Sequence, residues 1–385
     1  MSGLEAIGYA VKPQVMGYGV GVFEITKLSF CAFFVLVLRW GLAGVIASVV
    51  IAYLAQAVTL FLTLRLYITG YFDLKIIRKW FSKVWVPLYQ QLPDVPYQLT
   101  LILPAMWLGS TYPVALMTVP RVISNVIGYC SFLSVGLSPK LLSGSGGGKD
   151  VEVALKMVMM FAIPATLGVV ILARPLLYLL GSGYVAATLI LLVLSVKEFL
   201  ATLGSVLLST LLGTEKVELK RGASFKDYLK SKHCLISTLG LASSTASFLV
   251  LAFLILTFFH IGVSYEWLIF TYFLVTLLII VLPANVYLWL LTYKAIHFKF
   301  PVDSMFRCLV ASTIMSIAVT ITYPSAAFSH KSVLNIIATL FPTVFLGFAS
   351  YVLILVIIDR EARQLVVLAV KELLKPFKGV IGELA

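Results

Sequence analysis

The stretch Trp267–Tyr293, WLIFTYFLVTLLIIVLPANVYLWLLTY, has 27 residues and no charged side chain. An α-helix rises about 1.5 Å per residue and the hydrocarbon layer of a bilayer is about 30 Å thick, so about 20 mainly apolar residues are enough to cross it. Four further uncharged stretches have a similar length: Trp40–Leu64, Cys234–Phe259, Cys308–Ser329 and Ser332–Ile358. All five predict membrane-spanning helices.

The composition of the whole chain favours the same class of protein. Of its 385 residues, 61% are apolar and 12% are charged, against about 45–50% and about 25% in soluble domains. So few charged residues could not coat a water-soluble globule, whereas a bilayer accepts an apolar exterior. The sequence therefore excludes a soluble fold and predicts an all-α, multi-pass membrane protein.

Five weaker stretches bring the predicted number of transmembrane helices to ten: Phe23–Leu38, Val84–Gly109, Ser110–Leu137, Val153–Leu172 and Tyr184–Leu212. The first is short and contains Glu24 and Lys27, which is typical of a tilted or partial span. The second and third are expected to be two helices joined by a tight turn.

The basic residues then divide unevenly between the two membrane faces. With alternate loops on opposite sides, 22 Lys and Arg residues fall on one side and 3 on the other. The positive-inside rule places the side with more Lys and Arg, and both termini with it, in the cytoplasm. The plasma membrane is the predicted location of the protein. The net charge of +13 is thereby explained without a nucleic-acid partner, and the bilayer is the partner that the sequence indicates.

No catalytic motif or metal-ligand spacing is apparent. The four cysteines lie far apart, and no phosphate-binding loop, nucleophile elbow or His-Glu-x-x-His pattern occurs. We therefore predict no enzymatic activity, no cofactor and no bound metal, apart from a coupling ion, Na⁺ or H⁺. Chemistry is expected instead from polar side chains at membrane depth, which are costly to bury in lipid.

Asp94 is the first such residue, about ten residues into its predicted helix and so about 15 Å deep. Gln91 and Gln98 share its helical face, and four prolines favour a bent helix. This face is predicted either to line a polar cavity, with Asp94 binding substrate or a coupling ion, or to pair with a neighbouring helix.

Arg121 is the second, at about the same depth on the following helix, with Asn125 one turn further on the same face. A guanidinium can bind a phosphate through two parallel hydrogen bonds. Arg121 is predicted to bind an anionic substrate or to form a salt bridge with Asp94, and the two roles are compatible if substrate breaks the bridge.

Lys197 and Glu198 are the third group, about 20 Å from the outer end of their predicted helix and so nearer the cytoplasm. Lys197 is a second candidate phosphate ligand and Glu198 a second candidate ion-coupling carboxylate. Adjacent helical residues point about 100° apart, so both side chains are not expected to face one cavity.

Two segments carry a resemblance to a known family: Arg174–Ala187, RPLLYLLGSGYVAA, and Leu211–Lys216, LLGTEK. With the upstream Ser138–Ser143, SPKLLS, they resemble the polysaccharide biosynthesis flippases of the multidrug/oligosaccharidyl-lipid/polysaccharide exporter superfamily. The resemblance implies two pseudo-symmetric helix bundles around a central cavity and transport of a lipid-linked sugar by alternating access.

Such proteins have typically 12 to 14 helices, so the resemblance implies an amino-terminal bundle about four helices short. Either a partner chain or a missing segment is then expected to supply these helices. The resemblance divides the chain into a remnant of that bundle (1–64), a cytoplasmic interfacial helix (65–83), a six-helix bundle (84–292), two appended spans (293–358) and a cytoplasmic amphipathic tail (359–385).

We therefore expect a flippase-like transporter of a polyprenyl-phosphate-linked or diphosphate-linked oligosaccharide. Two alternatives stay open: a Na⁺- or H⁺-coupled exporter of small molecules, and a non-transporting fragment or subunit of a split flippase.

Overall fold

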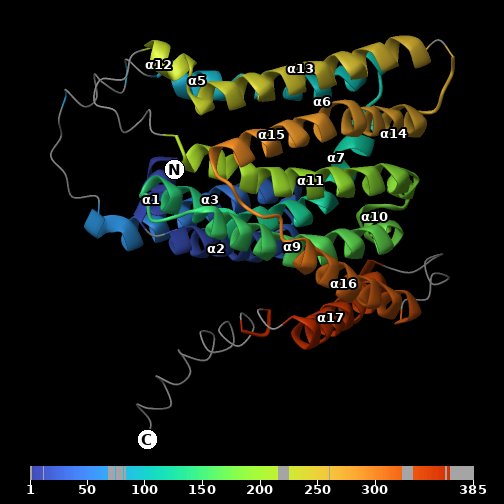
Figure 1. Cartoon of the computed structure of the whole chain (residues 1–385). Helices are drawn as coiled ribbons and strands as arrows, with labels where there is room; N and C mark the ends of the chain where they lie inside the picture. Colours follow the sequence, from blue (N-terminus) through green and yellow to red (C-terminus); the bar gives the residue numbers. More distant parts are fainter. Residues whose placement is uncertain are drawn as a thin grey trace, which may run out of the picture. The chain divides into compact units, whose positions relative to one another are not determined.

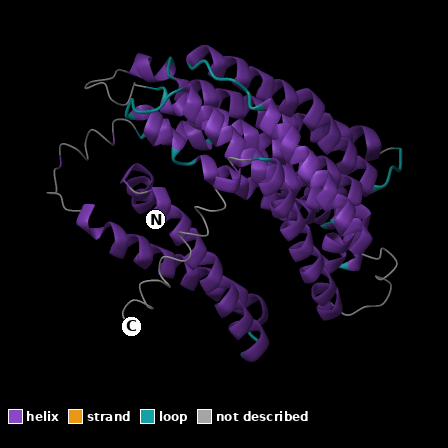
Figure 2. Cartoon of the chain, turned by 60° about the horizontal axis from the view of Figure 1, so that its bottom comes forward, coloured by secondary structure: helices purple, strands orange, loops and turns teal. Residues whose placement is uncertain are grey.

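A computed structural model describes residues 2–11, 13–67, 74, 81, 84–215, 225–259, 261–322, 333–359 and 362–364. Within these ranges the chain is helical, and it contains no strand (Figures 1 and 2). Nine of the described helical segments are long and apolar enough to cross a membrane: Gly17–Val37, Gly41–Leu64, Tyr112–Leu142, Gly148–Ile171, Ser182–Gly213, Lys232–Phe258, Tyr265–Ala295, Val302–Thr322 and Asn335–Ile358. The prediction of an all-α, multi-pass membrane protein is confirmed.

The predicted span Val84–Gly109 is not one continuous helix, so the described residues hold nine such segments and not ten. It divides at Leu92–Pro93 into α5 (Trp85–Gln91) and α6 (Asp94–Leu108). Pro93 has no backbone N–H and disfavours helical geometry at Leu92, while an acidic residue such as Asp94 suits the first turn of a new helix. The tight turn predicted after this segment is present, because Gly109 adopts φ +61° before α7 (Tyr112–Gly128) begins.

The described chain forms two compact units. The smaller unit comprises residues 1–87 and 135–146. Its elements are α1 (Ser2–Val11), α2 (Pro13–Ala32), the π-helical turn η1 (Phe33–Val37), α3 (Gly41–Leu64), the 3₁₀ turn η2 (Arg65–Tyr67) and α8 (Leu137–Leu142), with the first residues of α5.

Helices α2 and α3 pack along a face of α3 whose first half consists of small residues. The buried positions of α3 recur every four residues: Gly44, Ser48, Ala52, Gln56, Leu60 and Leu64. Residues four apart lie on one side of a helix, and small side chains there let two helices approach closely. A β-carbon on Gly44 would lie only 2.9 Å from the Cβ of Phe34, so this position requires glycine.

The first predicted span is a full-length one. It begins at Gly17 and not at Phe23, and α2 continues through η1 to Val37. Its two charges do not interrupt it, because Glu24 and Lys27 form an ion pair of 2.6 Å one helical turn apart. Such a pair reduces the cost of placing both charges at membrane depth.

The larger unit comprises residues 88–134 and 147–385. After α6 and α7 come η3 (Tyr129–Ser134), α9 (Gly148–Ile171), α10 (Ala173–Leu180), η4 (Ser182–Ala187), α11 (Thr188–Gly213), α12 (Phe225–Leu229), α13 (Lys232–Phe259), α14 (Tyr265–Val275), η6 (Thr276–Val281), α15 (Leu282–Ala295), α16 (Val302–Thr322) and α17 (Val333–Ile358).

Helix α11 lies at the centre of this unit and packs against α7, α9, α14 and α15 (Figure 1). It contributes many of the buried apolar side chains, among them Ile190, Leu191, Leu194 and Val206. Because α11 is packed on several sides, polar side chains at its middle can meet residues from several helices.

Helix α13 runs beside α5 and α6 and in the same direction. The Tyr89 and Thr238 hydroxyls are hydrogen-bonded at 2.7 Å, and Pro93 packs on Gly240. The broken segment therefore follows the first part of a long apolar helix.

The segment Arg174–Ala187, which carries the family resemblance, folds as α10 followed by η4. Gly181 adopts φ +147°, and a β-carbon there would lie 3.1 Å from the ring of Tyr184. Both facts require glycine at this corner.

The last two spans, α16 and α17, pack against each other, and α16 packs against α9 (Figure 1). The predicted interfacial helix at 65–83 and the tail at 359–385 lie largely outside the described residues. Of them the structure describes Arg65–Tyr67, Leu74, Phe81, Asp359 and residues 362–364.

Candidate functional site

Arg121 meets the side chain of Tyr97 inside the larger unit. It lies nine residues after Tyr112, the first residue of α7, and so about 14 Å along that helix. Its Nη1 donates a hydrogen bond to the Tyr97 hydroxyl, and its guanidinium carbon lies 5.0 Å from the centre of the Tyr97 ring. Helices α6 and α7 therefore bring the two side chains to one level.

Lys197 occupies the same level on α11. It lies nine residues after Thr188, where α11 begins, and its ammonium is 5.5 Å from the centre of the Phe273 ring on α14. The ammonium is also within electrostatic range of the Arg121 guanidinium and the Glu198 carboxylate. Two cations from different helices thus lie near each other at mid-span.

The prediction counted helical residues from Tyr184. Residues Ser182–Ala187 form the 3₁₀ turn η4, which packs against α10, and the α-helix starts at Thr188.

Glu198 points toward another part of α7. Its Oε2 lies 3.6 Å from the point where a β-carbon on Gly128 would be, two helical turns beyond Arg121. Lys197 faces Phe273 instead, so the two adjacent side chains diverge, as their helical spacing requires. Glu198 lies close enough to attract Lys197 but accepts no hydrogen bond from Arg121 among the described contacts.

The predicted polar face of α5 and α6 is exposed on the surface of the larger unit. Gln91, Asp94 and Gln98 are all exposed, and so is Asn125 on α7. Within the described part of the chain no ion pair joins Asp94 to Arg121, whose hydrogen-bond partner is Tyr97. The interpretation of Arg121 as the salt-bridge partner of Asp94 is therefore not what the structure shows.

We call Tyr97, Arg121, Lys197, Glu198 and Phe273 the mid-span cluster. It has two cations and one carboxylate, with aromatic rings beside both cations. A guanidinium and an ammonium at one level attract an anion strongly where competing water is scarce. Among the residues that the structure describes, no group of three His, Cys, Asp or Glu side chains lies together.

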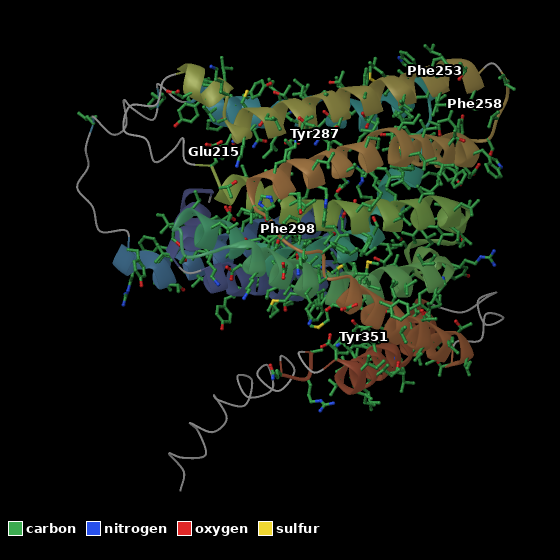
Figure 3. The ribbon with its side chains drawn as sticks, in the orientation of Figure 1. Glu215, Phe253, Phe258, Tyr287, Phe298 and Tyr351 are labelled. Carbon is green, nitrogen blue, oxygen red and sulfur yellow. The ribbon has the colours of Figure 1, made fainter. Side chains whose placement is uncertain are left out.

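A second charged group, the Asp359 cluster, was missed by the sequence analysis. Asp359 follows the last turn of α17 and is 2% exposed, with its carboxylate 3.7 Å from the Lys156 ammonium on α9 and 3.8 Å from the Arg307 guanidinium on α16. Tyr351, labelled in Figure 3, donates a hydrogen bond of 2.5 Å to the Met160 carbonyl oxygen on α9. These contacts tie α17 to α9 and α16.

The sequence held a signal for this cluster. Lys156 is a charge inside a predicted span, and Asp359 and Arg307 stand at the ends of two others. A buried acid between two bases is costly to disrupt, so the Asp359 cluster is explained by its structural role in holding α17 against α9 and α16.

The starts of α7 and α14 meet η4 near Tyr112. Its hydroxyl donates a hydrogen bond of 3.0 Å to the Glu266 carboxylate on α14 and a longer one of 3.5 Å to the Gly183 carbonyl oxygen in η4. Helices α7 and α14 thus start at the same end of the unit, and this shared start places Arg121 and Phe273 at similar depth.

Comparison of the chain with family models, with curated proteins and with solved structures gave no match.

Proposed function

We propose that this membrane protein is a flippase-like transporter, and that it translocates a polyprenyl-phosphate-linked or diphosphate-linked oligosaccharide or polysaccharide precursor across the plasma membrane. The observation that carries the proposal is the pair of cations, Arg121 and Lys197, held at one level inside two candidate spans. Cations at membrane depth are costly and typically mark a substrate path. The sequence resemblance to polysaccharide flippases supports the same function.

In this mechanism Arg121 and Lys197 bind the phosphate group. The sugar hydroxyls hydrogen-bond to the exposed amides of Gln91, Gln98 and Asn125, while the hydrocarbon tail stays in the bilayer. Tyr97 positions Arg121 by accepting its hydrogen bond. An incoming phosphate would offer Arg121 a charged acceptor in place of that neutral hydroxyl, which is a stronger hydrogen bond.

The break between α5 and α6 supports a moving part. Discontinuous helices near the bilayer midplane are common in transporters, where one half rocks against the other around the bound substrate. Asp94 stands at this break, exposed and without an ion-pair partner in the described chain. It is the stronger candidate for binding a coupling Na⁺ or H⁺, and Glu198, which lies near Lys197, is the weaker one.

Two further parts of the proposal concern the surroundings. The excess of basic residues on one side supports cytoplasmic termini. The exposed polar side chains of α5 and α6 need polar cover inside a bilayer, which supports a partner chain of the kind that the resemblance implies.

The proposal is tested with the full chain, alone and with any co-expressed partner, in vesicles that contain a fluorescent polyprenyl-diphosphate sugar. Translocation is measured as protection of the label from an impermeant quencher. We expect Arg121→Ala and Lys197→Met to abolish most transport and Lys294→Ala, on an exposed turn of α15, to leave it unchanged. Unimpaired transport by both cluster variants would contradict the proposed site.

The same vesicles separate the rival function. A small-molecule exporter driven by an ion gradient would move a cationic dye and ignore the lipid-linked sugar. Dye efflux that depends on Asp94 but not on Arg121 would favour that rival.

A further inference from the structure

The segment between α15 and α16, residues 296–301, crosses the first turn of α9. A β-carbon on Gly148 would clash with the His297 carbonyl oxygen, so the crossing requires glycine. Phe298, labelled in Figure 3, and Phe300 both pack edge-on against Trp289, with ring centres 5.0 and 5.2 Å away. These contacts fix the segment in place.

A polar hollow of about 390 Å³ lies beside this segment. Its charged lining consists of Glu152 and Lys156 from α9, Lys299 from the segment, and Asp303 from α16. One Glu152 oxygen accepts a hydrogen bond of 2.6 Å from the backbone N–H of Lys299. The volume is within the range of pockets that bind small molecules.

Only some of the charged side chains in this hollow form ion pairs with other residues of the described chain. Lys156 faces Asp359 at 3.7 Å, but no ion pair joins the Lys299 ammonium or the Asp303 carboxylate to another residue of the described chain. Both side chains are exposed. The hollow therefore offers one unpaired cation and one unpaired anion side by side.

An apolar hollow of about 270 Å³ lies next to it, between α9, α11 and α15. Leu155, Leu203, Leu207, Val286 and Trp289 form much of its wall, and Asn285 is its one polar lining residue. The Asn285 amide is turned to the Val281 carbonyl oxygen, to which it donates a hydrogen bond of 2.9 Å. This hollow suits a hydrocarbon chain.

Phe300 lines both hollows. The polar one lies beside the second and third turns of α9 and the start of α16, at the end of the unit where α11 and α15 finish. The apolar one extends along α11 from Leu207 back to Leu200, which is about 9 to 20 Å from the end of that helix at Gly213. In one leaflet of a bilayer, the polar head of a lipid lies at the surface and its hydrocarbon tail lies deeper. The polar and apolar hollows follow the same order.

We propose that the two hollows form one binding site for a phospholipid of the bilayer, with a head that carries both a phosphate and a primary ammonium group, as in phosphatidylethanolamine. The phosphate binds Lys299, the ammonium binds Asp303 and the free oxygen of Glu152, and an acyl chain occupies the apolar hollow. A head with both charges matches a pocket with both charges, whereas a purely anionic head would meet two carboxylates. The site is separate from the mid-span cluster and does not depend on what the chain transports.

The test uses the purified full chain, stripped of lipid and then mixed with equal amounts of phosphatidylethanolamine, phosphatidylglycerol and phosphatidylcholine of the same acyl chains. Native mass spectrometry measures which lipids stay bound. We expect phosphatidylethanolamine to be retained at least fivefold over the other two. Lys299→Ala should reduce its retention at least fivefold, and Asp303→Asn should bring it level with phosphatidylglycerol.

The tail is tested by Leu203→Trp, which fills the apolar hollow and should reduce retention of all three lipids. Matched controls are Lys294→Ala, an exposed lysine outside the hollow, and Leu249→Trp, an exposed position on α13; both should bind as the unchanged chain does. Equal retention of the three lipids, or wild-type retention by Lys299→Ala, would overturn the proposal. Competition by free phosphorylethanolamine as strong as that by the lipid would overturn the role of the apolar hollow.

Discussion

The mid-span cluster and the Asp359 cluster both place charges inside the same helical unit, yet they treat them in opposite ways. Asp359 is almost fully buried and lies between two bases, Lys156 and Arg307. The mid-span cluster also has two cations and one carboxylate, but no ion pair joins Glu198 to either cation among the described contacts, and Arg121 is bonded to a neutral hydroxyl. A carboxylate in contact with both bases holds helices together, whereas cations without a carboxylate in contact keep capacity for a ligand.

The largest effect is expected from Asp359→Asn, which leaves Lys156 and Arg307 facing an uncharged amide. Removal of one partner from a buried charged group costs about 3 kcal/mol of folding free energy. The unfolding midpoint of the purified chain in mild detergent should fall by several degrees. Asp303→Asn, an exposed acid without an ion-pair partner in the described chain, is the matched control and should shift the midpoint little. Equal midpoints for the two variants would show that the Asp359 cluster does not hold α17 in place.

Arg121→Ala is expected to act on transport and not on stability, with a loss of transport and little change in the unfolding midpoint. A charge-assisted hydrogen bond to a phosphate contributes roughly 1.5–3 kcal/mol, which corresponds to a loss of about ten- to a hundredfold in transport rate at limiting substrate. The assay is translocation of the labelled lipid-linked sugar, and the unfolding midpoint is the control. If the midpoint fell as far as that of Asp359→Asn, Arg121 would be a structural residue.

Tyr351→Phe tests the neutral part of the α17 attachment. It removes the hydrogen bond to the Met160 carbonyl oxygen and leaves the ring, so the expected loss is about 1 kcal/mol. The midpoint should fall between that of the unchanged chain and that of Asp359→Asn. A larger fall than for Asp359→Asn would mean that the hydroxyl, and not the ion pairs, attaches the last helix.

Lys197→Met has the smallest expected effect on stability, and the direction of the change in unfolding free energy is informative. It removes a buried cation and its repulsion of Arg121, which are favourable changes, and it deprives Glu198 of an attractive neighbour, which is not. Because the favourable changes oppose the unfavourable one, the free energy of unfolding should fall by less than about 0.5 kcal/mol, or rise. A loss of more than about 1 kcal/mol would place Lys197 with the structural charges.

Hydropathy alone identified most of the spans, because a long uncharged stretch in a membrane satisfies its backbone hydrogen bonds by forming a helix. It failed at Val84–Gly109, where the apolar composition is sufficient but Pro93 and Asp94 start a new helix. The prolines inside α6, α7 and α9 leave those helices continuous. Only the combination of proline with a following acid at a helix start distinguishes the break.

The partners of the charged residues were harder to predict. Sequence spacing placed Asp94 and Arg121 at similar depth, but helix rotation decides which side chains meet, and it turns Tyr97 toward Arg121. Similarly, Asp359 and Lys156 are distant in the chain, and nothing local in either helix indicates the other. Contacts of this kind depend on how helices pack and not on the pattern within one helix.

The central claim, that the mid-span cluster binds an anionic phosphate group and the Asp359 cluster does not, is tested most directly by titrating the purified chain with inorganic pyrophosphate and following its unfolding midpoint. A ligand that binds the folded state raises the midpoint in a saturable way. The account predicts such a rise for the unchanged chain and for Asp359→Asn, and none for the double variant Arg121→Ala with Lys197→Met. A saturable rise of equal size in the double variant would contradict it.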